Sequence, residues 1–231
     1  MDLPHQPKGL GFGLRPLQRL LMLGLNSVPL LHVAAVGATL GLAWAPWHWR
    51  LAAGTAMLYL LPPLLAGAVR IPAPVPVGRT LVSTNAFVVC GLWPTCRCFL
   101  PTPFLEELLR LIPGVYSLWL RLWGARIGRL TYWGAGLQIL DRSFLKIGDD
   151  VVFGAAVRLN PHVLQRNEQG AMELLLAPIV IEDRAIVGGY SLLTAGTEIA
   201  AGECTRAFTI SPPFNRWESG QRIAPRAASA P

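Results

Sequence analysis

The sequence contains few charged residues, and this shortage limits the classes of protein to which it can belong. Of its 231 residues only 14% are charged, whereas 52% are hydrophobic. Soluble globular domains carry about 25% charged residues, so this chain could scarcely cover a soluble surface. The composition therefore disfavours an ordinary soluble protein and favours a membrane-associated part joined to a second module.

Lysine is almost absent, because Lys146 is the only lysine besides Lys8. The net charge of +7 comes mainly from arginines that are spread singly along the chain. A nucleic-acid-binding surface needs basic side chains clustered on one face or in one run. The sequence contains no such run, so we expect no nucleic acid among the partners.

Cysteine and histidine are also scarce, with four residues of each. Cys90, Cys96 and Cys98 are clustered, while Cys204 is remote from them in sequence. A structural zinc site needs four ligands, and no histidine lies between Cys90 and Cys98 to complete a set. We therefore expect reduced thiols that are buried or face the membrane, and no bound metal.

Two long runs without a charged residue occur in the first third of the sequence. Residues 28–46 and residues 51–69 each match the roughly 20 residues that cross a hydrocarbon core. Pro62 and Pro63 interrupt the second run, so a re-entrant pair of half-helices is the alternative to a full span. We predict a membrane region over residues 1–70 with two apolar spans.

The charges that flank these runs predict the orientation of the chain in the membrane. Lys8, Arg15 and Arg19 precede the first run. Arg50 lies alone between the runs, and Arg70 follows the second. Positively charged flanks stay on the cytoplasmic side. We therefore expect a multi-pass protein of the cytoplasmic (inner) membrane with both termini in the cytoplasm, and no cleaved signal peptide.

Residues 71–123 are predicted to connect the membrane region to the next domain. The first part is rich in proline, glycine and cysteine, and its run LVSTNAFVVCGLW is a candidate third, shallow apolar segment. From Phe104 the apolar residues recur at helical spacing, interrupted by Glu106, Glu107 and Arg110. We expect one or two amphipathic helices that lie on the membrane or against the following domain.

Beyond residue 123 the periodicity of the sequence changes to six. Ile181, Val187, Leu193 and Ile199 are aliphatic and spaced six apart without a break. A period of six belongs neither to an ordinary helix nor to an isolated strand. It is typical of a hexapeptide-repeat β-helix, in which aliphatic side chains point into a three-sided prism and small residues turn its corners.

An earlier block has the same spacing, with one shift of two residues. Its repeat positions are Ile127, Trp133, Ile139 and Leu145, followed after the shift by Ile147, Phe153 and Leu159. Between Leu159 and Ile181 the period fails, and we interpret residues 160–178 as a loop that leaves the prism at a corner. We predict a mainly β fold with the β-helix over residues 124–205 and a C-terminal tail over residues 206–231.

Three segments of the repeat carry a resemblance to a known family: GARIGRLTYWGAG, FLKIGDDVVFGAAVRLNPHVLQRNE and IVIEDRAIVGGYSLLTAGTEI. Between about Trp123 and Arg222 the chain resembles the hexapeptide-repeat acyltransferases, and more narrowly the membrane-bound terminal module of nonribosomal peptide synthetases of the polylysine-synthetase type. The resemblance implies a short left-handed parallel β-helix preceded by transmembrane and amphipathic α-helices. It also implies a homotrimer, acyl-CoA or acetyl-CoA as co-substrate, and a biosynthetic synthetase as a candidate partner.

His162 is the candidate catalytic base. Acyl transfer from a thioester needs the attacking hydroxyl or amine to lose its proton, and histidine is the usual general base near neutral pH. His162 is the only histidine in the C-terminal half of the chain and lies in the predicted loop. The resemblance implies that this histidine faces a cleft between subunits. Its orienting partner stays open among Asn160, Glu168 and Glu182.

Two further groups of residues are candidates for binding coenzyme A. Small residues that could let the pantetheine arm lie along the prism, or that serve only tight turning, are Gly188, Gly189, Ser191, Ala195 and Gly196. Arginines that could pair with the phosphates, or that are merely solvated, are Arg206, Arg216 and Arg222.

The sequence therefore predicts a membrane-bound acyltransferase that carries an acetyl or other acyl group from coenzyme A to a hydroxyl or amine, with His162 as general base. The alternative is a catalytically silent membrane scaffold whose β-helix assembles or docks a partner synthetase. A third possibility is zinc-dependent hydration on this fold, as in the γ-type carbonic anhydrases. That chemistry needs three histidine ligands, which His162 cannot supply by itself.

Overall fold

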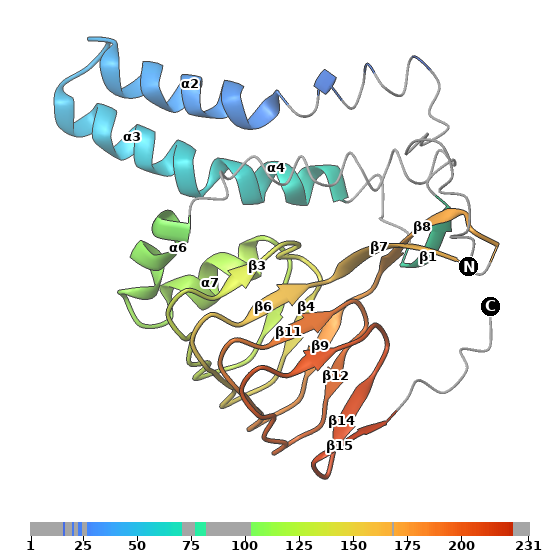
Figure 1. Cartoon of the computed structure of the whole chain (residues 1–231). Coiled ribbons are helices and arrows are strands. Elements are labelled where there is room, and N and C mark those ends of the chain that lie inside the picture. The colour runs from blue at the N-terminus through green and yellow to red at the C-terminus, as the bar shows by residue number, and fades with distance from the viewer. Residues whose placement is uncertain are drawn as a thin grey trace.

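A computed structural model describes residues 16, 20, 23–24, 27–70, 77–81, 103–167 and 169–223 of the chain. In the described residues, helices form a layer over one end of a stack of parallel strands (Figure 1). Several residues used in the sequence predictions lie outside these ranges: Lys8, Arg15, Arg19, residues 82–93 of the run LVSTNAFVVCGLW with Cys90, then Cys96, Cys98 and Glu168.

Three apolar helices make up the upper layer in Figure 1: α2 (Val28–Gly41), α3 (Trp47–Tyr59) and α4 (Leu61–Arg70). Helices α2 and α3 form an antiparallel hairpin, and a methyl group at Gly54 would lie 2.6 Å from the side chain of Leu40. Most leucine and tryptophan side chains of the three helices are exposed. Arg50 folds back onto the hairpin turn, where its guanidinium donates to the carbonyls of Leu40 and Leu42.

The predicted spans differ from the helices in extent. Within the described part of the chain, no single helix is long and apolar enough to cross a membrane, although α3 and α4 together pass that test with a bend of 42°. Helix α2 ends at Gly41, so the continuous span predicted over residues 28–46 is wrong in length. The bend precedes Pro62, which disfavours a helical conformation in the residue before it and is tolerated in the first turn of α4.

The predicted amphipathic segment forms two short helices, α6 (Pro103–Arg110) and α7 (Val115–Leu122). Gly114 separates them in a left-handed conformation with φ of 80°. Helix α7 packs onto the first coil of the strand stack, with Trp119 and Leu120 buried in the same apolar cluster as Ile127. The helices therefore lie against the first coil of the stack, which is the second of the two positions expected from the sequence.

The repeat folds into a parallel β-helix with three faces. The first face contains β2 (Arg126–Ile127), β4 (Leu145–Ile147), β9 (Ile179–Ile181), β12 (Glu198–Ile199) and β14 (Arg216–Glu218). The second contains β5 (Val152–Phe153) and β10 (Ile186–Val187), and the third contains β3 (Gln138–Ile139), β6 (Arg158–Asn160), β11 (Leu192–Thr194) and β13 (Ile210–Ser211). Neighbouring strands on each face run parallel, so the predicted three-sided prism is confirmed.

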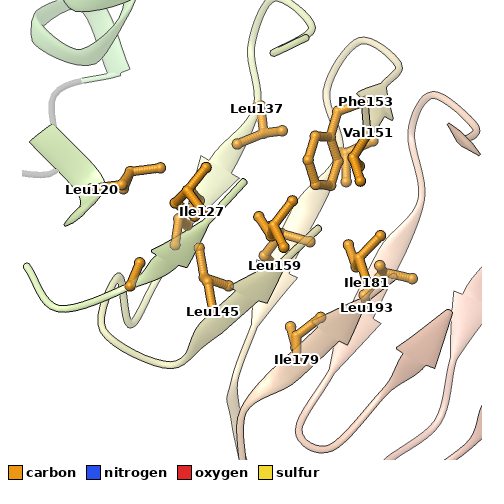
Figure 2. Packing of buried hydrophobic residues seen from close by; sticks show 14 of the residues in the cluster. Leu120, Ile127, Leu137, Leu145, Val151, Phe153, Leu159, Ile179, Ile181 and Leu193 are labelled. Carbon is orange, nitrogen blue, oxygen red and sulfur yellow. The ribbon is translucent and has the colours of Figure 1, made fainter. Parts of the chain in front are cut away.

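Repeat positions stack directly above one another. Ile127 pairs with Ile147, Ile147 with Ile181, and Ile181 with Ile199, all within one face. Their side chains point into the prism and are buried together with the repeat residues of the other faces (Figure 2). Complete burial of an aliphatic side chain stabilises the fold by about 1.5–3 kcal/mol. The six-residue period therefore exists because every sixth side chain enters the same core.

The corners of the prism are turned by residues in the left-handed conformation. Non-glycine residues of this kind recur mostly at intervals of six or a multiple of six: Leu130, Asp150, Ala156, Arg184, Tyr190, Phe208 and Phe214. Their φ values lie between 53° and 61°. Several of these side chains are large, so a corner does not require a small residue, although Gly136, Gly196 and Gly202 have the same positive φ at other corners. The requirement is one residue with positive φ, which the surrounding stack enforces.

Between β6 and β9 the chain leaves the prism as a β-hairpin, whereas an irregular loop over residues 160–178 was expected. Strands β7 (His162–Arg166) and β8 (Met172–Leu176) pair in antiparallel fashion. A third strand, β1 (Gly78–Leu81), pairs with β8 on its other side. We call these three strands the arm. The arm extends sideways from the prism below the layer of apolar helices (Figure 1).

The β-helix continues beyond the predicted boundary at residue 205. Strands β13 and β14 pair in parallel with β11 and β12, and β15 (Gln221–Ile223) then turns back antiparallel to β14. The repeat positions of this last coil are Thr205, Ser211 and Trp217, which are not aliphatic. Their polar atoms are paired inside the stack, since Trp217 Nε1 donates to Ser211 Oγ at 2.9 Å. Polar side chains in the core thus concealed the last coil from sequence analysis.

Candidate functional site

His162 lies at the root of the arm, beside a carboxylate from the preceding coil. Its Nδ1 atom is 2.5 Å from Oδ2 of Asp141. The His162 side chain is 29% exposed, while that of Asp141 is 12% exposed. The imidazole is thus accessible from outside while its carboxylate partner is largely shielded from water.

The stacking of the coils explains why these two residues meet. Ile139 pairs with Leu159, and the next amide, Leu140 N, donates to Leu159 O. The chain then turns at residues 141–144, closed by a bond from Phe144 N to Asp141 O at 3.1 Å. In the coil above, the arm leaves at the same corner. Asp141 therefore lies below the point at which His162 emerges.

Of the three residues proposed from the sequence as the orienting partner, neither Asn160 nor Glu182 has this position. Asn160 ends strand β6, and Glu168 lies outside the described residues. Glu182 accepts hydrogen bonds from Arg216 and from the backbone of Ala201, on a different face. The two-residue shift in the repeat could have identified Asp141 from the sequence. It lengthens the first coil to 20 residues, which is the separation of Ile127 and Ile147. Counting back that length from His162 leads to the turn that contains Asp141.

Apolar side chains surround the root of the arm. Phe144 packs against Leu174 and Leu176 of β8 on one side. On another side, Leu175 and Ala177 form a small cluster with Ala195, against which Val163 and Phe214 pack. A partly apolar setting around a histidine and a carboxylate strengthens their electrostatic interaction, since the local dielectric constant is lower than that of water.

Two of the predicted coenzyme A residues lie at the corner from which the arm leaves. Ala195 is buried in the cluster at the root of the arm. Gly196 has a φ of 70°, and its amide donates to Ala177 O at 3.4 Å. A methyl group at Gly196 would lie 2.4 Å from the ring of Phe214. The structure thus brings these two residues together with the His162 side of the prism.

The other predicted coenzyme A residues gather at a different corner of the prism. Gly188 and Gly189 follow β10, and a methyl group at Gly188 would lie 2.3 Å from the backbone of Arg206 in the next coil. Ser191 is 1% exposed, and its hydroxyl bonds the backbone of Arg206 and Thr209. The hydroxyl of Ser191 is therefore engaged in stacking the coils, whereas the side chain of Arg206 is exposed.

Arg216 is bound by carboxylates and is poorly placed to bind a phosphate. Its guanidinium donates to Glu182, Glu198 and Glu218 at 2.9 to 3.1 Å. These three acceptors raise the pKa of Arg216 above its ordinary value, with Glu218 making the largest contribution. Arg222, in contrast, lies exposed on β15.

Metal ligands do not gather in the part of the chain that the structure describes. No group of three or more histidine, cysteine, aspartate or glutamate side chains lies close enough together there to hold an ion. The cysteine cluster considered in the sequence analysis falls outside that part.

Comparison with solved structures finds chains that the protein resembles in part. A hexapeptide-repeat-containing acetyltransferase of Vibrio cholerae matches at 15% identity and a TM-score of 0.35, over 52% of this chain and 88% of that one. Galactoside acetyltransferase in complex with coenzyme A matches at 14% identity and a TM-score of 0.31, over 52% and 78% of the two chains. Serine acetyltransferase isoform 3 of Entamoeba histolytica matches at 12% identity and a TM-score of 0.23, over 83% and 69%. No protein family and no curated protein matches the sequence.

Proposed function

We propose that the chain is an acyltransferase that moves an acyl group from an acyl-CoA thioester to a hydroxyl or amine, with His162 as general base. The observation that carries the proposal is the 2.5 Å contact between His162 Nδ1 and Asp141 Oδ2. A histidine held by a carboxylate at one ring nitrogen is oriented for proton transfer at the other. The resemblance of the hexapeptide repeat to acyltransferases gives the reaction class.

The hydrogen bond to Asp141 fixes the tautomer of the imidazole. A carboxylate accepts the proton of Nδ1, so neutral His162 then carries its lone pair on Nε2. Nε2 takes the proton of the acceptor hydroxyl or amine as that group attacks the thioester carbonyl carbon. Asp141 stabilises the resulting imidazolium without itself taking the proton.

Collapse of the tetrahedral intermediate completes the transfer. The carbon–sulfur bond breaks, the acyl group stays on the acceptor, and the imidazolium returns its proton to the departing thiolate of coenzyme A. General acid–base catalysis of this kind contributes about 10²- to 10⁴-fold to the rate. Acetyl-CoA or another acyl-CoA is the co-substrate, and no metal takes part in these steps.

We also propose attachment to the cytoplasmic membrane through the apolar helices. The support is their composition and exposure: no charged residue occurs in α2, and Leu30, Leu31, Leu64 and Trp47 are among many exposed apolar side chains. Tryptophan side chains at the α2–α3 turn suit the boundary between lipid and water. Flotation of the full chain with lipid vesicles tests this proposal, and protein that stays at the bottom of the gradient would contradict it.

Assembly into a homotrimer, with the site facing a neighbouring subunit, belongs to the same proposal. The resemblance supports it, and so does the exposed stack of Tyr190 on Phe208, whose ring centroids are 5.2 Å apart on the outside of the prism. A synthetase partner rests on the sequence resemblance alone. Light scattering of the detergent-solubilised chain measures the oligomeric state, and a monomer at all concentrations would exclude the trimer.

The decisive experiment separates transfer from a silent scaffold. The purified full chain is titrated calorimetrically with coenzyme A, and release of the coenzyme A thiol from acetyl-CoA is followed with a panel of hydroxyl and amine acceptors. We expect binding and turnover by the wild type, binding without turnover by His162→Ala, and full turnover by His48→Ala, the control at a histidine outside the β-helix. Neither binding nor turnover by the wild type would favour the scaffold.

A further inference from the structure

The turn at residues 141–144 holds two neighbouring charged residues whose side chains have different partners. Asp141 contacts His162 at the root of the arm. Arg142, the next residue, contacts Glu106 of helix α6 and is only 7% exposed. A single turn therefore connects the candidate catalytic pair to the helices that cover the end of the prism.

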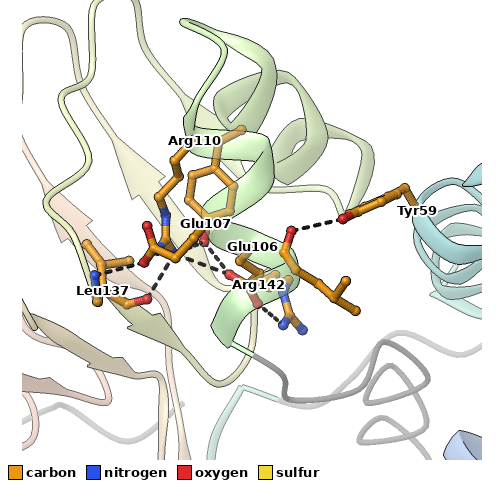
Figure 3. Close-up of polar contacts among 9 residues, drawn as sticks. Tyr59, Glu106, Glu107, Arg110, Leu137 and Arg142 are labelled. Carbon is orange, nitrogen blue, oxygen red and sulfur yellow. Dashed lines mark hydrogen bonds and ion pairs between the residues drawn. The ribbon is translucent and has the colours of Figure 1, made fainter.

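Arg142 is held by a buried network of polar side chains (Figure 3). Its Nη2 atom bonds to Oε1 of Glu106. The other oxygen of Glu106 accepts from the hydroxyl of Tyr116 at 2.5 Å and from Arg110 at 3.4 Å. Burial, and the charge of Glu106 beside it, raise the pKa of Tyr116, so its hydroxyl stays protonated as a donor.

Aromatic rings fix the guanidinium of Arg142 from another direction. It lies 5.3 Å from the ring centroid of Trp119 and 5.2 Å from that of Trp123, both of which are buried. Such cation–π contacts are stronger when they are shielded from water. Arg142 thus has an ion pair and two aromatic contacts, which restrict its side chain to one position.

Attachment of α6 and α7 to the prism does not depend on this polar network. Trp119, Leu120 and Trp123 already bury a large apolar surface against the first coil. A buried ion pair adds little stability over apolar residues of similar volume, because desolvation offsets the attraction of the charges. A buried ion pair instead fixes the geometry of its partners, and here it fixes the turn that begins with Asp141.

We propose that Arg142 is a positioning residue for the reaction described above: Glu106 and the indole rings of α7 hold Arg142, and Arg142 holds the turn so that Asp141 meets His162. Helices α6 and α7 thereby take part in shaping the active site through Arg142. The network also reaches the apolar hairpin. Tyr59 of α3 donates to Leu105 O at 3.1 Å, and its own carbonyl accepts from Trp119 Nε1 at 2.8 Å.

This inference rests on the proposed function, so its test combines a spectroscopic measurement with kinetics. The full chain is isotopically labelled at its histidines and measured in detergent by NMR. The Nδ1 proton resonance of His162 is assigned by its absence from the spectrum of His162→Ala. A short bond to a carboxylate moves this resonance far downfield. We expect Arg142→Gln and Glu106→Gln to lose the downfield signal and Arg142→Lys, which keeps the charge, to recover part of it.

The kinetic measurement uses acetyl-CoA and the same variants. A misplaced catalytic group costs about 10- to 100-fold in rate, so kcat is expected to fall by that factor while the KM for acetyl-CoA stays close to the wild-type value. Glu107→Gln is the matched control. Glu107 is the neighbouring carboxylate on α6 and bonds Arg110 and Gly136 N, but not Arg142.

Each result supports or overturns the inference. An unchanged downfield resonance and unchanged kcat in Arg142→Gln would overturn it, as would an equal loss of both in the Glu107→Gln control. If Arg142→Gln does not fold, Glu106→Gln is compared with Glu107→Gln by the same resonance and the same kcat. A wild type that transfers no acetyl group refutes the proposed function alone, because the resonance still reports whether Arg142 positions Asp141.

Discussion

Asp141 and His162 lie 21 residues apart in sequence, yet their side chains are joined by a 2.5 Å contact across two successive coils. Neither residue belongs to the repeat positions that build the core. The pair exists because the arm leaves the second coil directly above the turn that ends the first. The β-helix therefore provides the fixed distance between the two groups, and the arm provides access from solvent.

Replacing Asp141 with asparagine should lower kcat by about 10²- to 10⁴-fold, since an amide can hold the wrong imidazole tautomer and cannot stabilise the imidazolium. The measurement is acetyl transfer by the purified full chain at saturating acetyl-CoA. Asp149→Asn is the control, because Asp149 is also a corner carboxylate that bonds the adjacent coil, through Arg129. Equal activity in the two variants would remove Asp141 from the mechanism.

Coenzyme A binding should depend on Arg206 and not on Arg216. The Arg216 guanidinium is engaged by three glutamates, so Arg216→Gln is expected to leave the KM for acetyl-CoA unchanged. A hydrogen bond to a charged group contributes about 1.5–3 kcal/mol, so Arg206→Gln should raise that KM about tenfold or more. Steady-state kinetics compare the two variants. A higher KM in Arg216→Gln alone would reverse the assignment.

Two glycine substitutions should destabilise the prism by different amounts. In Gly188→Ala the new methyl group would lie 2.3 Å from backbone atoms of the next coil, so the stack must shift. Gly202 also lies at a corner, with φ of 69°, but nothing lies within 4 Å of a methyl group there. Overpacking costs about 1–3 kcal/mol or more, whereas a left-handed alanine costs about 1–2 kcal/mol. Denaturant unfolding should therefore show the larger loss for Gly188→Ala, and the reverse order would argue against close stacking.

Stability should fall in acid through the pair formed by Arg129 and Asp149. Hydrogen bonds from the backbone and then the side chain of Arg129 lower the pKa of Asp149 below its ordinary value of 3.8. The stabilisation is thus fully present above pH 3.8 and is lost as the pH falls through the lower pKa of the folded state. Thermal melting across this range should show the difference between wild type and Asp149→Asn shrinking toward strong acid. A difference that is independent of pH would contradict this account.

The core of the fold could be predicted from sequence because its signal is local and repetitive. Ile181, Val187, Leu193 and Ile199 occupy successive faces in the predicted order, and each is buried. The last coil could not be found in this way. Thr205 and Ser211 enter the core as polar residues whose hydrogen bonds are satisfied by neighbouring coils, so a search for aliphatic positions passed over them.

The site was only half predictable. His162 could be singled out as the one histidine of the repeat region, but its partner depends on which residues of different coils share a corner. That information is contained in the length of each coil and not in the residue types near His162. The buried pair of Glu106 and Arg142 was equally hidden, because charged residues in an amphipathic pattern are expected on the solvent side of a helix.

The last strand in the described part of the chain, β15, runs antiparallel to β14. A stack of parallel strands whose last edge is open can act as a template on which further coils, including those of another molecule, continue to grow into a fibre. Here the reversed strand, with Arg222 exposed on it, occupies that edge, while α7 occupies the opposite end. On the first face, β15 therefore blocks the pairing of a further parallel strand onto β14, and at the other end of the stack α7 packs onto the first coil.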